Sequence, residues 1–150
     1  RAARTCGELL REAGLEPFAM VTGSRGIHVT VPLRRSATTG FDRVRAFARE
    51  IAREMVAGDP RRLTLEARKQ KRGDRILIDI MRNSYAQTAV SPYAVRARDR
   101  APVAMPLRWE ELEDPHLRPD RWRMRTARER LEREGDAWSD IRSHARALRR

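Results

Sequence analysis

The sequence contains a single cysteine, and this scarcity excludes several kinds of protein. Cys6 cannot form a disulfide within the chain, and the absence of disulfides is typical of a reducing compartment. One cysteine and three histidines, scattered along the chain without the close spacing of zinc ligands, also do not form a Cys/His zinc motif. No apolar run approaches the roughly 20 residues that a membrane-spanning helix requires. The composition therefore predicts a cytoplasmic protein without a membrane partner.

Lysine is almost absent as well. Only Lys69 and Lys71 occur among the 33 basic residues, and all the others are arginine. The formal net charge is nevertheless +12, and the isoelectric point is about 11.4. An excess of this size favours a polyanionic partner, most simply nucleic acid. A GC-rich genome also produces an arginine bias, so the charge by itself leaves the partner open.

The length of 150 residues and the hydrophobic content of 40% indicate one folded domain with a core. Apolar spacing predicts helices over 1–13 and 41–57, and helical segments after residue 123. Strands are predicted at 18–21, 27–31, 63–65, 76–81 and 90–98. Four of the eight prolines fall in 99–121 and predict an extended surface segment with a short helix near Trp109.

This order of elements is typical of the α+β class. With one more strand before the first helix it would form a split β-α-β-β-α-β unit, the ferredoxin-like or RRM-like arrangement. We therefore predict a partial RRM-like subdomain over 1–98 that lacks its first strand. Residues 99–150 then contribute a proline-rich segment and C-terminal helices to the same domain. The chain begins with Arg1, which indicates a piece of a longer protein.

A loop of small residues with one cation leads directly into the second predicted strand. It contains Thr22, Gly23, Ser24, Arg25 and Gly26. Glycines allow backbone N–H groups to turn toward an anion, and an arginine can hold phosphate oxygens with two donors. Alternation along the following strand places His28 on the polar face, beside Thr30. An ordinary hairpin turn gives the same pattern, and short glycine motifs often occur by chance.

Asp79 is a single carboxylate near the centre of the apolar run 76–81. A buried charge without a partner costs several kcal/mol, so this side chain must face solvent, pair with a cation or bind a metal ion. A salt bridge to a nearby arginine explains the residue as well as a functional role does.

Two further groups of residues are candidates for nucleic-acid contacts. The basic turn comprises Arg68, Lys69, Lys71 and Arg72. Such runs are most often solvated charged turns. On the predicted strand 90–98, Tyr93 offers a stacking ring, and Arg96 and Arg98 offer cations.

Taken together, these segments resemble a known family. Residues 22–29, 76–83 and 91–98 are similar, in order, to motifs of the polymerase domain of bacterial ATP-dependent DNA ligase D. That domain belongs to the archaeo-eukaryotic primase superfamily. Segments 101–112 and 135–138 are similar to its C-terminal part. The resemblance covers nearly the whole chain.

The resemblance implies a nucleotidyltransferase that adds nucleotides to a primer 3′ end in non-homologous end joining, near the bacterial nucleoid. Two Mg²⁺ or Mn²⁺ ions would assist the attack of the primer hydroxyl on the α-phosphate. Asp79 is then the third catalytic carboxylate and a metal ligand. The nucleotide-binding residues implied are Thr22, Ser24, Arg25, Gly26, His28 and Arg96. The implied partners are DNA ends or primer-template, nucleoside triphosphates, Ku and a ligase domain.

One departure from the family limits this prediction. The family carries an Asp-x-Asp pair on a strand just before the helix that matches 1–13, and this chain begins after that strand. We therefore expect the 150 residues to be the C-terminal half of a polymerase domain, inactive without further sequence. An alternative is a non-catalytic RRM-like module that binds nucleic acid through Tyr93 and Arg96, although no aromatic pair interrupts its strands. A module that only docks repair partners is a third possibility.

Overall fold

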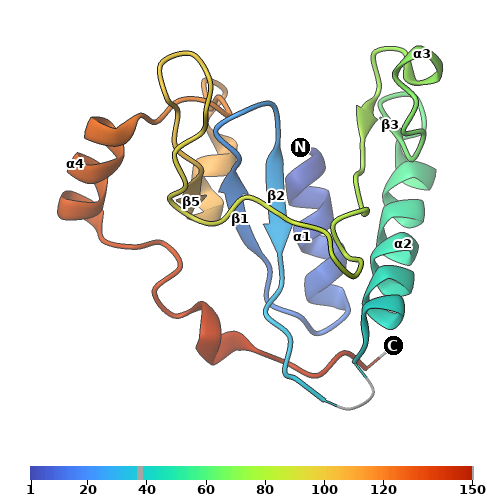
Figure 1. The fold of residues 1–150 in the computed structure, drawn as a ribbon. Helices are drawn as coiled ribbons and strands as arrows, with labels where there is room; N and C mark the ends of the chain where they lie inside the picture. The colour runs from blue at the N-terminus through green and yellow to red at the C-terminus, as the bar shows by residue number, and fades with distance from the viewer. Residues whose placement is uncertain (37–38, 150) are drawn as a thin grey trace.

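A three-stranded antiparallel sheet lies at the centre of the computed structural model, which describes residues 1–36 and 39–149 (Figure 1). Its strand order is β2 (Ile27–Thr30), β1 (Phe18–Val21) and β5 (Met105–Leu107). Met20 of the central strand pairs with His28 on one side and with Pro106 on the other. All four residues of β1 are buried, because the strand has a neighbour on each edge.

Two helices cover one face of β2 and confirm the apolar stripes predicted from the sequence. They are α1 (Ala2–Glu12) and α2 (Phe41–Gly58), which pack on each other. Leu10, Phe47, Ile51 and Met55 are buried between them. Val29 of β2 packs against the same cluster, so the strand turns its alternate residue, His28, toward the opposite side. Among the described residues, no helix is both long and apolar enough to cross a membrane.

A second, parallel pair of strands lies beside the C-terminal half of α2 (Figure 1). It consists of β3 (Leu63–Thr64) and β4 (Ile76–Leu77), joined through the one-turn helix α3 (Lys69–Arg72). The predicted strand over 76–81 is wrong beyond Leu77. The last bond of this ladder joins the Ile78 amide to the Thr64 carbonyl at 2.9 Å. Beyond that point the segment has no partner strand among the described residues.

The strand predicted over 90–98 is also wrong. Residues 93–104 form an irregular hairpin arm, with one isolated bridge between Val95 and Val103. Left-handed backbone at Tyr93, with φ of 63°, and at Arg100, with φ of 63°, interrupts a regular ladder. Pro102 lacks an amide donor and limits pairing further.

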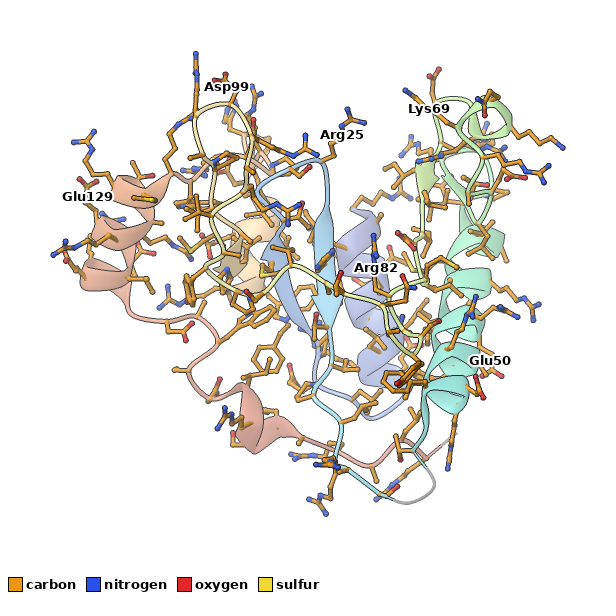
Figure 2. The ribbon with its side chains drawn as sticks, in the orientation of Figure 1. Arg25, Glu50, Lys69, Arg82, Asp99 and Glu129 are labelled. Atoms are coloured by element: carbon orange, nitrogen blue, oxygen red, sulfur yellow. The ribbon has the colours of Figure 1, made fainter. Side chains whose placement is uncertain are left out.

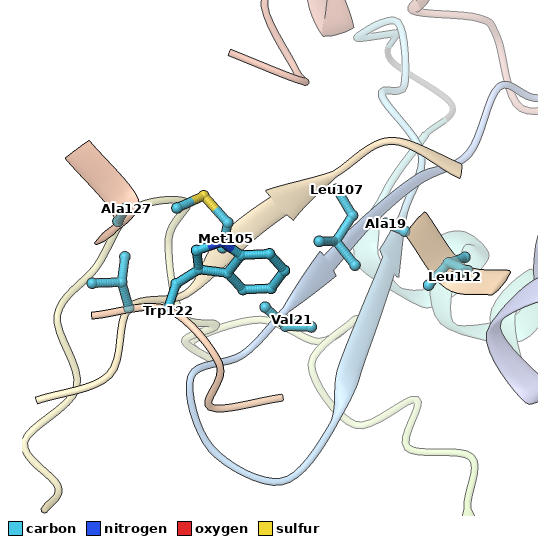
Figure 3. Packing of buried hydrophobic residues seen from close by; sticks show 8 residues of the cluster. Ala19, Val21, Met105, Leu107, Leu112, Trp122 and Ala127 are labelled. Atoms are coloured by element: carbon cyan, nitrogen blue, oxygen red, sulfur yellow. The ribbon is translucent and has the colours of Figure 1, made fainter. Parts of the chain in front are cut away.

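The proline-rich segment is predicted to lie on the surface, and this is wrong for β5, which joins the sheet and is buried. The 3-10 helix η1 (Trp109–Glu113) follows, then α4 (Met124–Glu134) and the 3-10 turn η2 (Ile141–His144). Of the helical segments predicted after residue 123, α4 is a regular helix, and the later part contains only the single turn η2. Figure 3 shows the core that α4 and β5 share with Trp122. The chain is thus an α+β protein whose C-terminal third completes the sheet.

Arg130 of α4 is a buried charged residue beside this core, and its side chain is only 7% exposed. The guanidinium pairs with Glu111 at 2.6 Å and with Glu134 at 3.1 Å, and it donates to the Pro106 carbonyl at 2.8 Å. It also lies 5.1 Å from the Trp122 ring centroid. A buried charge with this many partners fixes α4 against β5.

Candidate nucleotide-binding site

The loop of residues 22–26 is closed by the side chain at its first position. The Thr22 hydroxyl donates to the Gly26 carbonyl at 3.0 Å and accepts from the Gly26 amide at 3.3 Å. The hydroxyl of this buried residue is therefore used within the loop, although its predicted phosphate contact stays a prediction. Within residues 1–36 and 39–149, no hydrogen bond engages the backbone N–H of Ser24 or Arg25. Both amides can therefore donate to a ligand.

The loop packs directly against the hairpin arm at Gly23. This residue has a left-handed φ of 63°, and a Cβ atom there would lie 2.7 Å from Cγ of Arg96. The same Cβ would lie 3.0 Å from the carbonyl carbon of Val103. Glycine is required for both reasons. The close approach brings Arg96, predicted from a distant motif, next to the predicted phosphate loop.

His28 is half-buried on the face of β2 that the helices leave free. Burial lowers its pKa, the Asp79 carboxylate opposes this effect, and the cations Arg82 and Arg96 lower the pKa further. Two chain segments, one with Asp79 and Arg82 and one with Arg96, therefore approach the imidazole ring from outside β2. The lowered pKa favours the neutral ring at pH 7, which has one N–H donor for a ligand.

Asp79 lies two positions beyond the end of β4, on the segment that continues from that strand. Its side chain is exposed to solvent, which is one of the possibilities that the sequence left open, but the residue does not lie in a strand, contrary to the prediction. One carboxylate oxygen, Oδ1, accepts the Met81 amide at 2.9 Å. This bond orients the carboxylate and leaves Oδ2 for another partner.

Sequence reasoning did not select Arg82 as a site residue, although it lies three positions after Asp79. Figure 2 shows its side chain between β2 and α2. One guanidinium nitrogen donates to Oε1 of Gln87 at 3.3 Å. The predicted strand 76–81 ended before this residue, so its return toward His28 could not be anticipated.

Three loop tips project from the same end of the molecule in Figure 2, marked by Arg25, Lys69 and Asp99. Three residues of the predicted basic turn are exposed at the tip marked by Lys69, namely Arg68, Lys69 and Lys71. Arg72 differs, because it is half-buried and donates to the Ala67 carbonyl at 3.3 Å. The basic turn is the one-turn helix α3 with its flanking Arg68.

Tyr93 and Arg98 do not share a strand with Arg96, contrary to the sequence interpretation. The Tyr93 hydroxyl donates a hydrogen bond to Asp136, and burial, followed by that bond, raises the pKa of the phenol. Arg98 is exposed near the tip of the hairpin arm. Residues 94–98 line an open cavity of about 590 Å³ next to the loop. Arg96 and Arg98 therefore lie on the border of the site.

The donor set around Asp79 does not complete a metal centre. Within the described part of the chain, no three His, Cys, Asp or Glu side chains lie close enough to hold a metal ion. Two-ion sites are clamps that need several carboxylates, and Asp79 supplies one. A Mg²⁺ or Mn²⁺ site would need ligands from other sequence.

Comparison with known proteins places these features in a family. The model of the LigD primase-polymerase domain matches residues 1–138. The multifunctional non-homologous end joining protein LigD of Pseudomonas aeruginosa is 35% identical over 134 residues, which are 88% of this chain and 16% of that protein. The bifunctional LigD of Bacillus subtilis is 26% identical over 141 residues, which are 94% of this chain and 23% of that protein.

A solved structure shows the same fold. The polymerase domain of Mycobacterium tuberculosis ligase D, in complex with DNA, superposes with a TM-score of 0.87 and 29% sequence identity. The match covers 96% of this chain and 49% of that chain. The chain therefore spans about half of the solved domain and less than a quarter of the curated relatives. The 150 residues belong to the LigD primase-polymerase domain family.

Proposed function

We propose that this chain forms the nucleotide-binding part of a polymerase site that adds nucleotides to a primer 3′ end in non-homologous end joining. The observation that carries the proposal is the convergence on His28 of Asp79, Arg82 and Arg96, beside the 22–26 loop. A cationic pocket with free amides is suited to a triphosphate. The names of the relatives and the DNA-bound structure support the assignment.

Each site residue has a distinct role in this proposal. Arg25 and the amides of Ser24 and Arg25 hold the outer phosphates, where charge accumulates as the leaving group departs. Neutral His28 donates a hydrogen bond to a phosphate oxygen. Arg96, which lies against Gly23, supplies a further positive charge to the phosphates. Asp79 contributes one carboxylate to a Mg²⁺ or Mn²⁺ site whose other ligands lie outside these residues. The ions, when bound, would stabilise negative charge on the phosphates.

A further strand fits the open edge of the sheet in this account. β2 is the edge strand of the described sheet, and its Ile27 is 36% exposed. In the separate two-stranded sheet, Ile76 of β4 is 56% exposed. Apolar side chains at an edge strand favour pairing with another strand. A strand between β2 and β4 would complete the RRM-like sheet and bring its own carboxylates near Asp79.

The contact at Gly23 gives a test of the pocket. Gly23→Ala is expected to weaken triphosphate binding roughly five- to ten-fold, because the added methyl separates the loop from the hairpin arm by a few tenths of an ångström. Gly14→Ala is the matched control, since its φ of 78° is also left-handed but no atom lies within 4 Å of its added Cβ. Both variants carry the backbone cost of about 1 kcal/mol. Calorimetric titration that shows equal affinities for the two would refute the proposed contact.

The basic turn gives a second test, of DNA binding. Replacement of Arg68, Lys69, Lys71 and Arg72 by Gln should weaken binding of every DNA sequence alike. Each lost phosphate contact should reduce the slope of log K against log salt by roughly 0.7–0.9. Fluorescence anisotropy with labelled single-stranded and primer-template DNA at several salt concentrations measures this slope. An unchanged slope would show that the turn is only solvated, and would leave Tyr93, Arg96 and Arg98 as candidates.

A further inference from the structure

The two most exposed aromatic side chains of the chain contact each other. The sequence has only eight aromatic residues: three Phe, two Tyr and three Trp. The other six are buried or half-buried. Phe41, in the first turn of α2, is 56% exposed and Tyr85 is 80% exposed. Their ring centroids lie 5.9 Å apart, with the ring planes at 79°. This edge-to-face geometry is a favourable one, so the pair holds two distant segments together at the surface.

Met81 is a third exposed apolar residue on the same two segments of the chain. Its side chain is 49% exposed, and its sulfur accepts a hydrogen bond from Arg45 at 3.4 Å. The Nε atom of Arg45 is buried and has no hydrogen-bond partner among the described residues. We name Phe41, Met81 and Tyr85 the aromatic platform. An exposed patch of this kind, rimmed by polar residues, marks an interaction surface.

The aromatic platform is connected to the nucleotide site by a fixed turn. The Met81 amide donates to Asp79 at 2.9 Å, and the Asn83 amide donates to the Ile80 carbonyl at 3.1 Å. The segment that carries Asp79 toward His28 therefore also carries Met81 and Tyr85. A nucleic-acid strand bound at the nucleotide site would therefore lie next to a segment that also carries part of the aromatic platform.

We propose that the aromatic platform binds single-stranded nucleic acid, with one base stacked on the Phe41–Tyr85 pair. The inference rests on the proposed function, since it places the nucleic acid beside the nucleotide site. The stretches 41–45 and 81–85 carry three arginines and one carboxylate, in a chain of net charge +12. Exposed aromatic rings among arginines are the combination that binds single strands, because stacking holds the bases and cations hold the phosphates.

The test uses a short thymidine oligonucleotide with one 2-aminopurine, whose fluorescence falls when the base stacks. Titrated with the full chain, it should bind with quenching. Tyr85→Ser and Phe41→Leu should each weaken binding roughly ten-fold and remove the quenching. The slope of log K against log salt should stay unchanged, since no phosphate contact is lost. Met124→Ala, an exposed apolar residue of α4 (63% exposed), is the control and should bind as the parent does.

Any of the following outcomes would contradict the proposal that the aromatic platform binds single strands. If the parent binds the oligonucleotide and the Tyr85 and Phe41 variants bind equally well, the platform is wrong while the nucleotide site stands. If the parent binds no oligonucleotide but does bind triphosphate, single strands are not its ligand. If neither ligand binds, the proposed function fails as well. If Tyr85→Ser changes only the molecular mass measured by light scattering, the patch joins copies of the chain.

Discussion

Asp79→Ala is expected to abolish primer extension by the chain when it carries at its amino terminus the sequence that supplies the additional strand. A carboxylate that holds a metal ion contributes several kcal/mol to the transition state, so the rate should fall by a factor on the order of 10³ or more. The Met81 amide orients the carboxylate, and Asp79 is near enough to His28 to oppose the lowering of the histidine pKa, which supports this role. Extension of a labelled primer on a template with Mn²⁺ measures the rate.

Asp74→Ala provides the matched control, since Asp74 is an exposed aspartate just before β4. It should retain the parent rate. The 150 residues without extension should not extend a primer, because the described residues supply no second carboxylate near Asp79. Metal-dependent extension by the 150 residues alone, or an active Asp79→Ala variant, would contradict the proposed role.

Arg25→Ala is expected to weaken binding of a nucleoside triphosphate by about 1.5–3 kcal/mol, which is roughly ten- to a hundred-fold. The arginine projects from the tip of the β1–β2 turn and is exposed, so its removal leaves the core intact. The matching monophosphate lacks the outer phosphates and should lose much less affinity. Calorimetric titrations of both nucleotides measure the difference.

Arg35→Ala is the control for the loss of one positive charge, because Arg35 is exposed beyond the other end of β2. Its effect should be small and equal for both nucleotides, as expected from screened long-range attraction. If Arg25→Ala weakens the triphosphate and the monophosphate equally, Arg25 does not contact the outer phosphates. The loop would then have only a structural role.

The helices could be predicted from the sequence because each has a complete apolar stripe. Leu10 in α1 and Phe47, Ile51 and Met55 in α2 all lie in the core that their spacing indicated. The strand lengths could not be predicted in the same way. Residues 78–81 alternate like a strand, yet they lack a partner beyond Thr64, and strands form only where a neighbour accepts their hydrogen bonds.

The candidate site shows the same division. Individual motifs identified Arg25, His28 and Asp79, since each residue type suits phosphate or metal chemistry. The contact of Gly23 with Arg96 and the return of Arg82 toward His28 depend on tertiary packing. Tyr93 illustrates the same limit, because the strand predicted to carry it does not form and its hydroxyl donates a hydrogen bond to Asp136, while its predicted contact with bases stays a prediction.

Mapping of triphosphate contacts by NMR tests the central claim most directly. The amide signals of the isotopically labelled chain, with its additional amino-terminal sequence, would be followed during titration with a nucleoside triphosphate. The account predicts that the largest shifts fall on Ser24, Arg25, His28 and Arg96, because these residues form the proposed nucleotide site. Shifts confined to the basic turn, with none on the 22–26 loop, would contradict this claim.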